Sequence, residues 1–166
     1  MTPTRRSLLA AGAALPLLRA WPARAQRQPG VLRFGLSSFP PSIQPWVNTG
    51  TAAATVKLLI HRGLVSFAPD GSLRGEIAES WSNDSPTTWT FRLRENALFQ
   101  NGDRVTAEDI RWNLEQMAAE RSTAYYRAQA QRIARIETPD ARTVRIVTME
   151  PMVTLPLWFA NYHMMM

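Results

Sequence analysis

Residues 87–116 have the sequence TTWTFRLRENALFQNGDRVTAEDIRWNLEQ, and this stretch decides most of the fold. Trp89, Phe91 and Leu93 alternate with threonine and arginine, which predicts a strand with one apolar and one polar face. A strand of this kind has to bury its apolar face. We therefore expect Trp89 and Phe91, together with Trp81, to lie in the core.

The second half of the stretch predicts a turn followed by a helix. The Asn-Gly pair at 101–102 is typical of a turn. The segment 106–109, TAED, has the pattern of a capping box, in which a threonine and an acidic residue satisfy each other's backbone N–H groups. We expect a helix over residues 106–120. Its predicted apolar stripe consists of Ile110, Leu114, Met117 and Ala118.

Toward the N-terminus, the sequence predicts a strand, a loop and another helix. Residues 31–36, VLRFGL, alternate in a strand-like pattern, and three prolines within residues 37–50 predict a loop. Apolar residues then recur at helical spacing over 52–60, with Thr49 or Thr51 placed to cap the helix. The apolar face expected for this helix consists of Ala52, Val56, Leu59 and Ile60.

Shorter segments carry weaker patterns. Residues 64–67 predict a strand before a Pro-Asp-Gly turn, and residues 76–81 predict a short helix. A further helical piece is expected over 124–132, followed by a β-hairpin over 133–147.

Strands and helices are mixed without a repeat, so we expect an α/β fold of the mixed α+β kind. The strand at 89–93, the hairpin at 133–147 and the helix at 106–120 each have a single apolar face. We therefore expect the strand and the hairpin to share one sheet that packs against the helix.

The first 25 residues have the layout of an export signal. A charged start precedes an apolar run over 8–18, too short to span a membrane, and Ala-Arg-Ala at 23–25 offers a cleavage site. Arg5 and Arg6 lie within TRRSLL, which predicts the twin-arginine route. An ordinary secretory signal that happens to carry two arginines is the alternative. Both interpretations predict a periplasmic protein.

The composition excludes several kinds of function. The chain has 19 Lys+Arg and 13 Asp+Glu, but four arginines and no acids lie in residues 1–25, so the remainder gives no support for nucleic-acid binding. The absence of cysteine excludes thiolate metal sites and cysteine nucleophiles. His61 and His163 are far apart, and the first turn of a helix explains Glu108 and Asp109. We expect no metal, no cofactor and no catalysis.

The order of these segments resembles the N-terminal part of the family 5 extracytoplasmic solute-binding proteins, the oligopeptide-, dipeptide- and nickel-binding components of ABC importers. The resemblance is carried by residues 32–81, 87–116 and 133–147, with short motifs such as GLV at 63–65 and AESW at 78–81. It implies a two-lobed, periplasmic-binding-protein-like fold that closes over a ligand. It also implies a considerably longer chain and a protein that catalyses no reaction.

On this resemblance the chain divides into four parts. Residues 1–25 are the export signal, and residues 26–75 are the start of the first lobe, with its strand, cleft loop and helix. Residues 76–150 are an accessory subdomain, and residues 151–166 are a truncated continuation. The second lobe and the returning strands of the first lobe have no counterpart, so we expect an incomplete fold.

The resemblance also implies where a ligand binds. In the family, the loop between the first strand and the first helix lines the cleft, and small residues at a helix start leave its backbone N–H groups approachable. An aromatic residue of the accessory subdomain reaches the same cleft, and tyrosine offers both apolar area and a hydroxyl. The candidates are Ser38, Phe39, Asn48, Thr49, Thr51, Tyr125 and Tyr126.

Structural roles explain the same residues as well. Thr49 or Thr51 serves as a helix cap in this interpretation, and the alanines that follow allow close packing. One of Tyr125 and Tyr126 then belongs to the subdomain core and the other to the surface. Trp46 fits either a cleft wall or an anchor for the loop.

The resemblance implies capture of a solute, foremost a peptide, for an ABC importer. The partners are then the ligand and the permease subunits, and the protein acts as a monomer without nucleic acid. The alternatives are a non-functional truncated remnant and an exported enzyme, although a glycine-rich nucleotide loop and clustered histidines are missing. We expect residues 1–166 alone to be marginally stable and to bind no ligand tightly.

Overall fold

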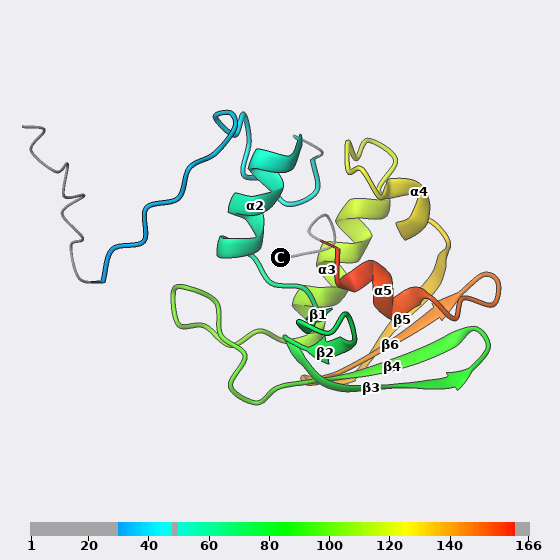
Figure 1. Ribbon diagram of the computed structural model, residues 1–166. Helices are drawn as coiled ribbons and strands as arrows, with labels where there is room; N and C mark the ends of the chain where they lie inside the picture. Colours follow the sequence, from blue (N-terminus) through cyan, green and yellow to red (C-terminus); the bar gives the residue numbers. More distant parts are fainter. Residues whose placement is uncertain (1–29, 48–49, 162–166) are drawn as a thin grey trace, which may run out of the picture. The chain divides into compact units, whose positions relative to one another are not determined.

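The computed structural model describes residues 30–47 and 50–161, and Figure 1 shows their elements. The chain separates into two units, Met1–Gly35 and Leu36–Met166. Of the first unit only residues 30–35 are described, and every described helix and strand lies in the second unit.

A four-stranded antiparallel sheet organises the second unit (Figure 1). Its strands lie in the order β3-β4-β6-β5, so the hairpins β3–β4 and β5–β6 are joined by pairing between β4 and β6. Phe91 on β4 lies opposite Val144 on β6. The bounds are Ala78–Ser85 for β3, Thr88–Leu93 for β4, Ile133–Asp140 for β5 and Thr143–Thr148 for β6.

Helix α3, Ala107–Ala118, packs against β5 and β6. Thr106 caps it: its hydroxyl accepts a hydrogen bond from the Asp109 N–H at 3.4 Å, and the Asp109 carboxylate accepts one from the Thr106 N–H at 2.7 Å. The capping box is therefore confirmed. The prediction that the strand and the hairpin share one sheet covered by this helix is also confirmed.

The core of this unit includes the layer between the sheet and α3. Phe91 is completely buried there, which confirms its predicted role, while Trp81 and Trp89 are half-buried and pack against the core. The indole N–H of Trp89 donates to the carbonyl of Met152 at 2.9 Å, which satisfies its one polar group. Further buried side chains of this layer are Leu93, Ile110, Leu114, Met117, Val144 and Ile146.

Helix α2, Gly50–Ile60, and a two-stranded hairpin precede the sheet. Strand β1, Val65–Phe67, pairs with β2, Leu73–Gly75, which confirms the short strand and the turn predicted after it. Gly71 in the turn has a φ of +83°, a left-handed conformation that glycine adopts without steric cost.

The predicted short helix at residues 76–81 is wrong. Residues from Ala78 onward belong to β3, where Trp81 pairs with Phe91. Strand β4 supplies hydrogen-bond partners for the backbone of this polar segment, so tertiary pairing overrides its weak helical pattern.

The predicted strand at residues 31–36 is also wrong. A strand needs a neighbour that satisfies its backbone N–H and C=O groups. Within residues 30–47 and 50–161, no strand pairs with this segment. Its alternating sequence is therefore not sufficient to form a strand.

Two short helices complete the described elements, and the first lies within a segment predicted to be helical. Helix α4 spans only Arg127–Ala130, so the helical piece predicted over 124–132 is present but shorter. Helix α5, Leu155–Phe159, is buried on one side, and the Phe159 ring meets Phe91 edge to face at 5.3 Å between centroids. Residues beyond 150 therefore contribute to the core.

None of the described helices has the length and hydrophobicity needed to cross a bilayer. The division of the chain at residues 25, 75 and 150 stays a prediction.

Candidate functional site

The loop that precedes α2 presents several of the predicted ligand-binding residues. Ser38 and Phe39 are exposed, and Phe39 is 90% exposed. Thr51 is exposed in the first turn of α2. Asn48 and Thr49 lie outside the described residues. The structure therefore leaves Ser38, Phe39 and Thr51 accessible to a ligand.

The alanines at the start of α2 have a packing role. Ala52, Ala53 and Ala54 are all buried, so their small side chains let this turn approach its neighbours closely. Thr51 lies inside the helix, and its carbonyl accepts a hydrogen bond from the Thr55 hydroxyl at 3.0 Å. Thr51 is therefore not the cap, and in this first part of the helix only Gly50 and Thr51 are exposed.

The apolar face predicted for α2 is wrong at Leu59, while Val56 and Ile60 are half-buried. Leu58 and Leu59 are exposed, whereas Lys57 is completely buried. The helix therefore turns the face that carries Ala53 and Lys57, four residues apart, toward the protein. The alanine run is consistent with this face, but no pattern in the sequence indicates that Lys57 is buried.

Lys57 contacts the candidate loop, although it was not identified from the sequence. Its ammonium group donates a hydrogen bond to the Val47 carbonyl, in the loop that carries the candidate residues. Burial lowers the pKa of the Lys57 ammonium, because a charged group loses hydration in the interior. The ion pairs between described residues do not include Lys57.

Tyr125 and Tyr126 lie just before α4. Their rings meet edge to face, 5.1 Å apart between centroids. Tyr125 is 55% exposed, whereas Tyr126 is half-buried and its hydroxyl accepts a hydrogen bond from the Asn161 amide at 3.2 Å. Tyr125 therefore offers more surface to a ligand, and Tyr126 is tied to the core side.

Trp46 brings the loop and the tyrosines together. Its backbone carbonyl accepts a hydrogen bond from the Tyr125 N–H at 2.8 Å. Its indole N–H donates to the side-chain oxygen of Asn113 on α3, also at 2.8 Å, and its ring lies 6.4 Å from that of Trp112. Trp46 is therefore an anchor of the loop, which it links to Tyr125 and to α3.

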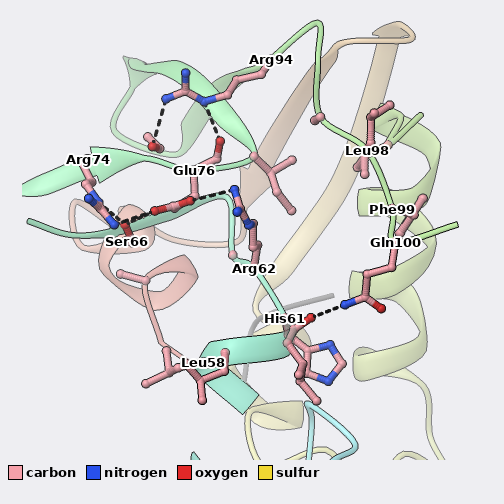
Figure 2. Close-up of a pocket in the computed structure, with 18 of the residues that line it drawn as sticks. Leu58, His61, Arg62, Ser66, Arg74, Glu76, Arg94, Leu98, Phe99 and Gln100 are labelled. Atoms are coloured by element: carbon pink, nitrogen blue, oxygen red, sulfur yellow. Dashed lines mark hydrogen bonds and ion pairs between the residues drawn. The ribbon is translucent and has the colours of Figure 1, made fainter. Parts of the chain in front are cut away.

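A separate open groove lies beside the end of α2 (Figure 2). It has a volume of about 1330 Å³ and is lined by the end of α2, the β1–β2 hairpin and residues 94–100. Glu76 lies 3.6 Å from Arg62 and 2.9 Å from Arg74, and Arg94 donates to the carbonyls of Glu76 and Gly75. None of the candidates within residues 30–47 and 50–161 lines this groove, so it is distinct from the surface that presents them.

Comparison with known families decides what kind of protein carries this site. Residues 72–166 match the model described as bacterial extracellular solute-binding proteins, family 5 Middle. The chain belongs to this family. Family 5 solute-binding proteins are binding proteins and not enzymes, so the prediction that the chain catalyses no reaction is confirmed.

Curated relatives agree with this assignment. The periplasmic oligopeptide-binding protein OppA of Salmonella typhimurium is 29% identical over 136 residues, which is 77% of this chain and 25% of OppA. The OppA of Escherichia coli is 31% identical over 115 residues, or 64% of this chain and 21% of that protein. The chain therefore spans about a quarter of the length of the family 5 proteins it matches.

Solved structures show the same fold. The binding protein AgaA from A. tumefacien R10, determined in complex with agropinic acid, is 36% identical, with a TM-score of 0.75 over 78% of this chain and 26% of AgaA. OppA of Burkholderia pseudomallei superposes with a TM-score of 0.70 at 22% identity, over 76% of this chain and 28% of that one. The prediction of a mixed α/β part of a periplasmic-binding-protein fold is therefore confirmed.

Proposed function

We propose that this chain takes part in capturing a peptide in the periplasm for an ABC importer. The observation that carries the proposal is the hydrogen bond from the Tyr125 N–H to the Trp46 carbonyl, which joins the exposed loop to the tyrosine pair. The relationship to periplasmic oligopeptide-binding proteins supports peptide as the ligand class. The proposed partners are the ligand and the permease subunits, with the protein acting as a monomer and without a cofactor.

The chemistry of the candidate residues suits a peptide. A peptide presents backbone N–H and C=O groups with side chains between them, so its site combines hydroxyl groups with apolar surface. Ser38 and Thr51 supply hydroxyls, and Phe39 and Tyr125 supply exposed aromatic rings. Asn48 and Thr49 remain part of the proposed site, as does Tyr126 at its inner edge.

Titration of the full chain with trialanine, followed by NMR, tests this function. We expect weak binding, with a Kd of roughly 1 mM or higher, because a ligand on one exposed surface stays hydrated on its other side. The shifted resonances should centre on Ser38, Phe39, Thr51 and Tyr125. Phe39→Ala should remove most of the shift, whereas Phe67→Ala, a matched exposed phenylalanine in the groove, should leave it unchanged.

Two outcomes contradict this prediction. Shifts centred on the groove beside Phe67 would place the ligand elsewhere. Micromolar affinity would show that the described surface is a more complete site than we propose, since one-sided contacts do not supply the desolvation that such affinity needs.

A second ligand class follows from the relationship to AgaA. Its structure contains agropinic acid, and it is 36% identical to this chain. Agropinic acid is therefore the competing candidate ligand. The same titration with agropinic acid discriminates the two classes, because the ligand that shifts the Phe39 and Tyr125 resonances at lower concentration is the better match.

We further propose that residues 1–25 direct the protein across the membrane by the twin-arginine route. Replacing Arg5 and Arg6 by lysine keeps the positive charge but removes the arginine pair that defines the signal. We expect export of this variant to fall strongly, measured as the share of protein recovered in the periplasm. Replacement of Arg19 and Arg24 by lysine is the control. Normal export of the Arg5/Arg6 variant would indicate the ordinary secretory route.

A further inference from the structure

Residues 43–47 are held from several sides by side chains that lie far away in the sequence. Lys57, buried on α2, donates to the Val47 carbonyl, and the Nε2 atom of His61, directly after α2, lies 3.0 Å from the Ile43 carbonyl. From α3, Asn113 accepts the Trp46 indole N–H. This short segment is therefore hydrogen-bonded to side chains of two different helices, accepting from Lys57 and donating to Asn113.

Asn113 occupies a position where packing alone favours an apolar residue. It is only 6% exposed and shares the buried face of α3 with Ile110, Leu114 and Met117. A buried amide costs free energy unless it is hydrogen-bonded, so its bond to Trp46 offsets that cost. The same argument applies to Lys57, whose charge is buried and whose ammonium is bonded to the Val47 carbonyl.

Lys57 and Asn113 bond to adjacent residues of the loop, Val47 and Trp46. Lys57 holds Val47, immediately before the part of the loop that enters α2, and Asn113 holds Trp46, whose carbonyl accepts the Tyr125 N–H. Loss of either bond frees the loop from one helix while leaving the apolar core between the sheet and α3 in place.

We propose that Asn113 and Lys57 are positioning residues, which hold residues 43–47 against α3 and α2 and so fix the geometry between the loop and Tyr125. As a statement about ligand binding, this inference rests on the proposed function. As a statement about the loop, it stands on the hydrogen bonds alone.

Hydrogen exchange of two protons tests the inference. In Asn113→Leu, exchange of the Trp46 indole N–H and the Tyr125 amide N–H should accelerate roughly tenfold, the factor expected for the loss of one hydrogen bond. Asn113→Asp keeps an oxygen acceptor and should restore slow exchange. The Trp89 indole N–H, bonded to the Met152 carbonyl, is the internal control and should not change.

Lys57→Met is the independent variant, because it removes a donor that lies on α2. It should accelerate exchange of the same two protons and again spare Trp89. Unchanged exchange of the Trp46 indole N–H in both Asn113→Leu and Lys57→Met would overturn the inference. Equal acceleration at Trp46 and Trp89 would overturn it too, because it would mean that these residues only support global stability.

The trialanine titration of the same variants separates this inference from the proposed function. If both are correct, Asn113→Leu reduces the peptide-induced shifts at Phe39 and Tyr125, and Asn113→Asp recovers them. If the positioning role is correct and the ligand assignment is wrong, hydrogen exchange responds to the variants while the wild-type chain shows no response to peptide.

Discussion

Gly63→Ala is expected to detach α5 from β1 and to lower the free energy of unfolding by at least about 3 kcal/mol. A Cβ atom at residue 63 would lie 2.1 Å from the backbone carbonyl oxygen of Phe159 and 3.1 Å from that of Val65. Overpacking in a core costs about 1–3 kcal/mol when side chains can adjust. A backbone oxygen cannot rotate away, so helix α5 has to move.

Urea denaturation of the full chain measures this effect. Gly35→Ala is the matched control, since no atom lies within 4 Å of a Cβ at that position, and its free energy of unfolding should stay within about 0.5 kcal/mol of wild type. An unchanged midpoint for Gly63→Ala would contradict the close approach of α5 to this residue.

Phe91→Ala is expected to destabilise the protein by about 3–5 kcal/mol, the range for removal of a buried phenylalanine. Phe91 is completely buried at the centre of β4, and its ring contacts that of Phe159. The alanine variant leaves a cavity that the paired strands on both sides cannot close. It also removes the edge-to-face contact.

Phe39→Ala tests the same side-chain loss at a residue that is 90% exposed, and its free energy of unfolding should change by less than about 0.5 kcal/mol. Phe91→Leu should lie between the two, because it fills part of the cavity. Unfolding in urea is monitored by circular dichroism. Comparable destabilisation by Phe91→Ala and Phe39→Ala would contradict the assignment of the core.

The parts of the fold that the sequence predicts correctly are those specified by local interactions. The capping box at Thr106 is made by residues three positions apart. The alternation of apolar and polar residues around Phe91 indicates which face of β4 is buried. Residues 76–81 were misassigned because their conformation depends on β4, and residues 31–36 were misassigned because no strand pairs with them in the described part of the chain.

In the candidate site, too, contacts between residues far apart in the sequence could not be predicted. Ser38 and Phe39 in the loop and Thr51 in α2 are exposed, and their role in ligand binding stays a prediction. The contact from Trp46 to Asn113 joins residues 67 positions apart, and no local pattern indicates it. The burial of Lys57 depends on which face of α2 turns inward, and tertiary contacts decide that.

The strand order β3-β4-β6-β5 also determines how fast this unit folds. Each hairpin joins strands that are adjacent in the chain, and isolated hairpins form in about 1–10 microseconds. Pairing of β4 with β6 instead closes a long loop that contains α3 and α4. Closing this loop costs chain entropy before the contacts between β4 and β6 contribute any stabilisation. We therefore expect docking of the two hairpins to be the slow step, and the capped α3 shortens the flexible chain that this step has to close.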